Sequence, residues 1–185
     1  EGVLKVLFTP EQFDMPSVNC MLSDRDGLIW IGANNGLFSF DGKRFSHFNI
    51  SENVNANNIV SLFEDYEGNL WLGTHSGMFR FRGEAFSAFG APEGLSGNFI
   101  YGISRDHEGR LWVGTENAGV FIYENQRFLN LDRRKGLPSN QVNMVFPNED
   151  GSVWLGTGAG LSIFRNGAFT NYSKADGLEI GRAHV

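Results

Sequence analysis

One short pattern recurs four times in this chain of 185 residues, and it limits the possible fold more than any other feature. Each copy has a glycine three residues before a tryptophan, a second glycine two residues after it, and an apolar run that begins with a third glycine. Trp30, Trp71, Trp112 and Trp154 are spaced 41, 41 and 42 residues apart. A fixed period of this length, carried by short apolar runs and glycine turns, is typical of β-propeller blades.

Each repeat predicts four short strands and no helix of useful length. Apolar residues twelve and nine positions before each tryptophan predict a first strand of about six residues. The second strand holds the tryptophan and the third follows the next glycine. Both strands are nearly continuously apolar, which predicts burial on both faces between stacked sheets. The fourth strand carries two apolar residues three positions apart, a spacing for which we expect a bulge or a strong twist.

The fold class predicted is therefore all-β, a propeller fragment of about four four-stranded blades in an open arc. Residues 1–14 are expected to end a preceding blade, and residues 179–185 to be a non-native, adapter-derived tail because they follow none of the pattern. The four consecutive blades are expected at about 15–56, 57–97, 98–139 and 140–178. Such an arc exposes apolar inter-blade faces at both ends, so we expect the chain alone to aggregate or to oligomerise.

Charge and cysteine content exclude several classes of function. The formal net charge of -6 gives no basic surface for nucleic acid or for an anionic membrane. Cys20 is the only cysteine, which excludes an internal disulfide and a cysteine-based zinc site, and we expect it to be a small buried apolar side chain. No apolar run reaches the roughly 20 residues of a membrane span, and no leader pattern opens the chain.

The motifs together resemble the two-component regulator propeller repeat, over roughly residues 15–178. The shared elements are Asp-x-x-Gly-x-Leu-Trp-x-Gly-Thr, Gly-Leu-x-x-Phe, Phe-x-x-Phe and Gly-Leu-Pro-Ser-Asn. Three places depart from this pattern: Ala33 replaces the threonine, residues 49–57 lack Gly-Leu, and Pro147 stands at the end of a first strand.

The resemblance implies a bacterial, extracytoplasmic or periplasmic sensor region of a membrane-anchored signalling protein, built of seven-bladed propellers. It implies a transmembrane segment and an output domain, either a histidine kinase or a diguanylate cyclase, farther along the same protein. Some relatives sense polysaccharide breakdown products. The implied partners are therefore a small-molecule or oligosaccharide ligand, the remaining blades and the output domain, with a homodimer as a further option and no nucleic acid.

The acidic turns and the tryptophans each have two interpretations. Pairs such as Asp65 with Glu67 could bind a metal, but calcium needs about six to eight oxygen ligands, so we expect each Asp to cap its hairpin instead. The tryptophans could stack sugars, but their place between apolar residues favours a role in the core. No histidine has metal-ligand spacing and no nucleophile motif is present, so no metal, cofactor or catalytic site is expected.

Ligand contacts are expected at the loops between second and third strands and at the junctions between blades, which share one end of the sheets. Amide and hydroxyl groups there suit a polyhydroxylated ligand, although asparagine is also a common turn former. The candidate ligand-binding residues are Asn34, Asn35, His75, Glu116, Asn117, Asn57, Asn98, Asn140, Arg133 and Arg134.

Three functions are open at this point. A ligand-sensing module without catalysis is favoured by the resemblance and by the lack of a catalytic motif. A scaffold for protein–protein interaction or dimerisation is the alternative. A propeller lyase or glycosidase is less favoured, because it needs an acid and a base near one bond, assembled from separate blades.

Overall fold

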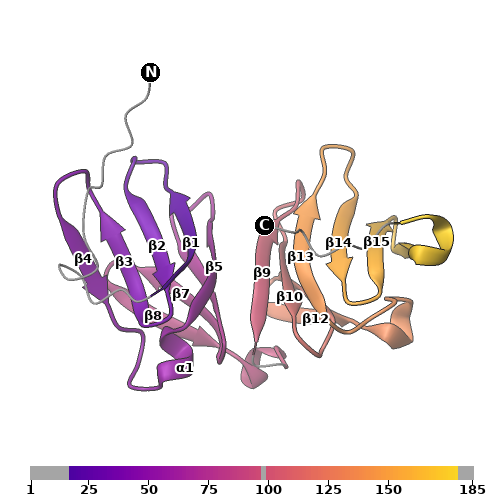
Figure 1. Cartoon of the computed structure of the whole chain (residues 1–185), viewed down its shortest axis with the longest axis horizontal. Helices are drawn as coiled ribbons and strands as arrows, with labels where there is room; N and C mark the ends of the chain where they lie inside the picture. Colours follow the sequence, from indigo (N-terminus) through magenta and orange to yellow (C-terminus); the bar gives the residue numbers. More distant parts are fainter. Residues whose placement is uncertain (1–16, 97–98, 179–185) are drawn as a thin grey trace.

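The structure, a computed structural model, describes residues 17–96 and 99–178. This part of the chain forms four antiparallel sheets, each made of four consecutive strands and here called blades 1 to 4 (Figure 1). Blade 1 consists of β1 (Val18–Ser23), β2 (Ile29–Ala33), β3 (Gly36–Phe40) and β4 (Phe45–Phe48), and blade 2 of β5 (Ile59–Glu64), β6 (Leu70–Thr74), β7 (Gly77–Arg82) and β8 (Ala85–Phe89). Blade 3 consists of β9 (Ile100–Arg105), β10 (Leu111–Thr115), β11 (Val120–Glu124) and β12 (Arg127–Leu131), and blade 4 of β13 (Val142–Pro147), β14 (Val153–Thr157), β15 (Gly160–Arg165) and β16 (Ala168–Tyr172). The prediction of an all-β open arc is confirmed.

The first strands of the blades lie nearest the common axis, where β1 contacts β5, β5 contacts β9 and β9 contacts β13. Each first strand has a bulge near its start, which leaves one residue without a partner on the second strand. The bulged residues are Asn19, Val60, Tyr101 and Asn143. Because a bulge bends its strand and redirects a side chain, its recurrence in every blade marks it as part of the repeat.

Each of the first three tryptophans is held by the turn that precedes it. The indole N–H donates to an aspartate six residues earlier, in the pairs Trp30–Asp24 (2.8 Å), Trp71–Asp65 (2.8 Å) and Trp112–Asp106 (2.7 Å). The other oxygen of the Asp106 carboxylate accepts the backbone N–H groups of Glu108 and Arg110, which confirms the capped hairpin. In blade 4, where Asn148 replaces the aspartate, Trp154 donates to the hydroxyl of Ser152 at 3.0 Å.

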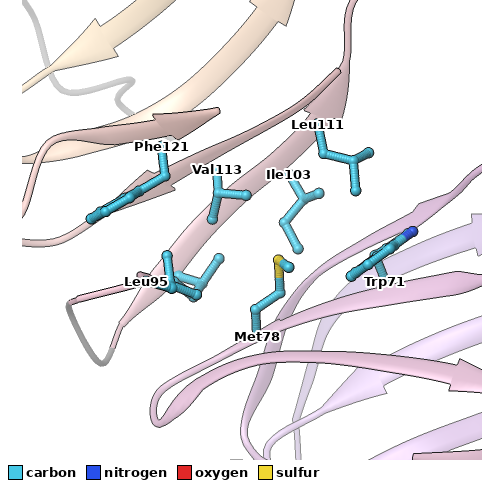
Figure 2. Close-up of a cluster of buried hydrophobic side chains, with 8 residues drawn as sticks. Trp71, Met78, Leu95, Ile103, Leu111, Val113 and Phe121 are labelled. Atoms are coloured by element: carbon cyan, nitrogen blue, oxygen red, sulfur yellow. The ribbon is translucent and has the colours of Figure 1, made fainter. Parts of the chain in front are cut away.

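The hydrophobic cores lie between blades. Figure 2 shows the core between blades 2 and 3, in which Trp71 and Met78 face Ile103, Leu111 and Phe121. Each of the first three tryptophans contacts an aromatic ring on the third strand of the next blade, in the pairs Trp30–Phe81, Trp71–Tyr123 and Trp112–Phe164. The predicted core role of the tryptophans is thus confirmed for the first three. Trp154 is 39% exposed, because no described blade follows it.

The two apolar residues of each fourth strand point to opposite faces of their blade. Phe86 packs in the core toward blade 1, and Phe89 packs in the core toward blade 3. The fourth strands pair with the third strands without any shift of register, so the bulge expected there is wrong. A spacing of three residues is odd, and in a regular strand it places one ring on each side.

Glycine allows adjacent blades to approach closely behind each tryptophan. A Cβ atom on Gly114 would lie 2.8 Å from the carbonyl oxygen of Val142, at the start of the next first strand. A contact this short with a backbone atom is essentially never found for a Cβ, so the backbone would have to shift. At the equivalent Gly156 of the last blade, the nearest atom to an added Cβ is the Cβ of Met144, at 3.2 Å.

The junctions after blades 2 and 3 each contain a short 3-10 turn, η1 (Ala91–Glu93) or η2 (Arg133–Lys135). A glycine with a positive φ ends each of these turns. The leucine after each of these glycines, Leu95 or Leu137, is buried in the core between blades. A third such turn, η3 (Lys174–Asp176), follows blade 4. The first junction lacks Gly-Leu and instead forms one turn of helix, α1 (Val54–Asn57), in which Ala56 is buried.

Cys20 is half-buried against the core between blades 1 and 2, and burial raises the pKa of its thiol to about 11. The predicted role as a small packed side chain agrees with this setting. Within residues 17–96 and 99–178, no helix has the length and apolar character required to cross a bilayer. The predicted segments 1–14 and 179–185 lie outside the described residues.

Candidate functional site

The two ends of the blades differ in the connections that they carry. We call the end with the second-to-third strand loops and the junctions the junction face, and the opposite end, with the tight hairpins, the turn face. In Figure 1 the junction face includes α1 and lies at the lower edge. All candidate ligand-binding residues that the structure describes belong to the junction face.

A chain of polar contacts follows the inner strands on the junction face of blades 1 and 2. The side-chain amide of Asn19 donates to Asn58 Oδ1 at 3.0 Å and to the backbone carbonyl of Ile59 at 2.9 Å. The amide of Asn58 in turn lies 3.1 Å from His75 Nδ1, and the His75 ring lies 4.5 Å from the ring of Phe99. His75 is thus fixed in place by its neighbours on both sides.

The chain continues on blade 3. Glu116 donates its backbone N–H to the carbonyl of Phe99, and its carboxylate accepts a long hydrogen bond of 3.4 Å from the Tyr101 hydroxyl. Burial and the neighbouring charge of Glu116 both raise the pKa of Tyr101, so its hydroxyl keeps its proton and remains a donor. Phe99 therefore links the candidates His75 and Glu116, which belong to different blades.

Two of the candidate asparagines hold junctions together. Asn57 accepts from the backbone N–H of Ile50 at 2.7 Å and donates to the carbonyl of Ser51 at 2.7 Å. Asn140 accepts from the backbone N–H of Arg133 at 3.0 Å. Both contacts join residues at the two ends of a junction, so these side chains fix its path.

The remaining candidates are more dispersed. Asn34 and Asn117 are exposed at loop tips, and the Asn35 carbonyl lies 3.1 Å from His47 Nε2. Arg134 bonds Asp132 at 2.6 Å, although its side chain is 88% exposed. Its neighbour Arg133 is exposed. Asn98 lies outside the described residues.

Sequence reasoning missed four members of this chain of contacts, Asn19, Asn58, Phe99 and Tyr101. Asn19 and Tyr101 occupy the bulge positions, so the common signal was their place at the start of each first strand. The resulting surface presents amide, hydroxyl, imidazole and carboxylate groups beside an aromatic ring. Such groups can donate to and accept from a hydroxylated ligand. Among the described residues, no group of three or more His, Cys, Asp and Glu side chains could hold a metal ion.

Comparison with solved structures finds the same fold in extracellular sensor domains. The extracellular domain described as that of a hybrid two-component system from B. thetaiotaomicron is 28% identical, with a TM-score of 0.78 over 89% of this chain and 24% of that one. A second such domain from the same organism is 30% identical, with a TM-score of 0.73 over 86% of this chain and 22% of that one. This chain therefore spans about a quarter of the length of these structures.

Virginiamycin B lyase from Staphylococcus aureus also matches, with a TM-score of 0.68 and 13% identity over 84% of this chain and 55% of the lyase. At that identity the likeness concerns the fold alone. Comparison with curated proteins gave no significant match.

The model of the two-component regulator propeller family matches residues 13–35, 53–76, 94–117 and 136–159, which together make up slightly more than half of the chain. Each match ends in the loop that follows a tryptophan strand, so the four matches share the phase of the four blades. This chain is homologous to extracellular domains of hybrid two-component systems and belongs to the two-component regulator propeller family.

Proposed function

We propose that this chain is a non-catalytic, ligand-sensing propeller segment on the extracytoplasmic side of a bacterial membrane-anchored signalling protein, and that its ligand is a carbohydrate. The observation that carries the proposal is membership of the family, together with homology to extracellular domains of hybrid two-component systems. In such a protein an output domain, a histidine kinase or a diguanylate cyclase, reports ligand binding.

The junction face supplies the chemistry for this proposal. His75, Glu116 and Tyr101 come from two adjacent blades and meet around Phe99. Their donors and acceptors suit sugar hydroxyls, and the aromatic ring offers an apolar surface of the kind that a sugar face covers. A ligand that contacts both blades binds most tightly at one relative position of the blades, which is the physical requirement for signalling.

The test uses the intact signalling protein that contains this chain, with a transcriptional or phosphorylation readout. The ligands are defined oligosaccharides from plant and bacterial polysaccharides. We expect His75→Ala, Glu116→Ala and Asn117→Ala to weaken the response at least about tenfold, because each removes a group expected to contact the ligand. The matched control is Glu149→Ala, an exposed residue on the turn face. An unchanged response in all three variants contradicts the assignment of the site to the junction face, whereas turnover of an oligosaccharide contradicts the non-catalytic role.

A further inference from the structure

A cavity of about 380 Å³ opens on the turn face between blades 2 and 3, at the opposite end of the blades from the candidate residues above. Its lining includes Asn69 and Trp71 from blade 2, and Arg105 and Tyr123 from blade 3. Binding sites for small molecules are commonly about 300–1,000 Å³. The inter-blade cavity, as we call it, is thus large enough for a ligand of monosaccharide size.

The equivalent space between blades 1 and 2 is smaller, about 200 Å³, because an arginine crosses it. Arg25 bonds the Glu64 carboxylate at 2.8 Å and the carbonyl oxygens of Asp65 and Tyr66. The residue at the same position of blade 2 is Tyr66, which instead stacks with the Arg105 guanidinium at 4.2 Å. Each space is therefore crossed by a contact from the same position of the preceding blade, but Tyr66 does not line the inter-blade cavity, whereas Arg25 lines the space between blades 1 and 2.

Arg80 lines the inter-blade cavity and is out of place in the repeat. It pairs with Trp71 across β6 and β7, at a position that holds Ser39, Ile122 and Ile163 in the other blades. Its guanidinium lies 5.7 Å from the Trp71 ring and 5.4 Å from the Phe89 ring. Its Nε atom is buried and has no hydrogen-bond partner among the described residues.

Arg80 is partly buried, and a buried guanidinium nitrogen without an acceptor is costly because its desolvation is not offset by a hydrogen bond. Aromatic faces offset only part of that cost. None of the ion pairs within the described ranges includes Arg80. Blade 2 thus carries a cation at a position where the other three blades carry an uncharged residue.

Asn69 supplies a hydrogen-bond acceptor in the lining of the same cavity. Its side chain is almost fully buried, and its amide donates to Asp65 Oδ2 at 2.8 Å and to Glu67 Oε2 at 3.3 Å. Its carbonyl oxygen, Oδ1, is buried and has no donor within the described part of the chain. Within the described residues, the cavity lining therefore includes an amide oxygen without a donor and a guanidinium without an ion-pair partner.

The carboxylates of the cavity lie at its rim or are already engaged. Asp65 accepts from Trp71 and Asn69, and Glu108 pairs with Arg110 at 2.7 Å. Glu67 and Glu124 are exposed. Arg80 is thus a partly buried cation that pairs with none of these carboxylates in the described part of the chain, although the buried Asp65 belongs to the same lining.

We propose that the inter-blade cavity binds a small hydroxylated carboxylate. The carboxylate of the ligand pairs with the guanidinium of Arg80, and one of its hydroxyl groups donates to Asn69 Oδ1. A guanidinium and a carboxylate form strong charge-assisted hydrogen bonds, and a hydroxyl matches an amide oxygen. This site is separate from the junction face, so it stands or falls independently of the sensing site proposed above.

The test is calorimetric titration of the intact protein with three probes. Galacturonate carries both groups, galactose lacks the carboxylate, and tartrate is an open-chain hydroxy acid that separates sugar acids from hydroxy acids in general. We expect saturable binding of galacturonate and at least about tenfold weaker binding of galactose, the effect of losing one charge-assisted hydrogen bond. If tartrate binds as tightly as galacturonate, the site accepts hydroxy acids as a class. If tartrate binds more weakly than galacturonate, the site is specific for sugar acids.

Three variants locate the site. Arg80→Ile places in blade 2 the residue that blades 3 and 4 already carry, so we expect unfolding at the same or a higher temperature, with galacturonate affinity lowered at least about tenfold. Asn69→Leu is also expected to lower the affinity for galacturonate. It should change the preference for galacturonate over galactose less than Arg80→Ile does. Arg82→Gln, two residues along the same strand and exposed, is the matched control and should bind like the wild type.

Three results overturn the proposal. The first is the absence of carboxylate-dependent binding to the wild-type protein. The second is an Arg80→Ile variant that binds galacturonate as tightly as the wild type. The third is a marked loss of stability in Arg80→Ile together with unchanged binding in Asn69→Leu, which assigns Arg80 to packing alone. Loss of galacturonate binding with an unchanged signalling response leaves the junction-face proposal intact and separates the two sites.

Discussion

The hydrogen bond between Asp106 and Trp112 is predicted to contribute substantially to stability, and Asp106→Ala tests it. The Trp112 ring is fully buried, so the substitution leaves its indole N–H without an acceptor at a cost of about 1–3 kcal/mol. The turn also loses the acceptor of two backbone N–H groups, which adds roughly 1 kcal/mol. The free energy of unfolding should therefore fall by about 2–4 kcal/mol.

Urea unfolding followed by far-ultraviolet circular dichroism measures this change. Asn148→Ala is the matched control, because the equivalent side chain in blade 4 does not bond Trp154, and we expect it to cost less than about 1 kcal/mol. Trp112→Phe removes the donor instead of the acceptor. A double-mutant cycle of Asp106→Ala with Trp112→Phe should give a coupling of about 1–2 kcal/mol. Equal costs for Asp106→Ala and Asn148→Ala, or a coupling near zero, would refute the reasoning.

Three further predictions concern the approach of blades 3 and 4, the ionisation of Asp106 and the exposed face of blade 4. Gly114→Ala should destabilise the protein by at least about 2 kcal/mol because its Cβ meets the Val142 carbonyl, and Gly156→Ala should cost clearly less; equal unfolding midpoints for the two variants would contradict this. Burial alone raises the pKa of Asp106, but hydrogen bonds from Trp112 and from the Arg110 side chain and backbone outweigh it and hold that pKa below its ordinary value of about 3.9. The resulting stability is present above the unfolded-state pKa and is lost as the pH falls through the lower folded-state pKa, so acid unfolding below about pH 4 should be steeper in the wild type than in Asp106→Ala. The chain expressed alone should self-associate through the exposed apolar face of blade 4, and Phe146→Ser, which changes a residue 58% exposed on that face, should reduce the mass measured by light scattering; a wild-type chain that is monomeric at all concentrations would argue against it.

The strand order within each blade could be predicted from the sequence because the tryptophan repeats with a fixed phase. The aspartate six residues before Trp30, Trp71 and Trp112 was visible too, but its bond to the indole was not, because a hairpin cap explains the same residue. The bulge expected in the fourth strand was wrong, because a spacing of three residues was taken as a departure from a regular strand. In a blade covered on both sides, a ring on each face is the simpler outcome.

The functional surfaces depend on contacts between blades, and the sequence of a single repeat predicts only part of those contacts. Asn57 and Asn140 were predicted as ligand-binding residues, and the sequence did not show that their side chains also bond backbone groups of their own junctions. The two spaces between blades differ in their linings: Arg25 lines the space between blades 1 and 2, whereas the equivalent Tyr66 does not line the inter-blade cavity. Its one signal in the sequence was Arg80, an arginine where the other repeats carry serine or isoleucine.

The opposed apolar side chains of each fourth strand also bear on how such a chain can grow. Phe86 faces the preceding blade and Phe89 the following one, so a single repeat has complementary left and right surfaces. Duplicating or excising one whole unit of about 41 residues, as spaced by the tryptophans, brings together two surfaces that already match. Gene duplication can therefore lengthen this protein without any new packing solution, while an insertion of half a unit would join two surfaces that do not fit.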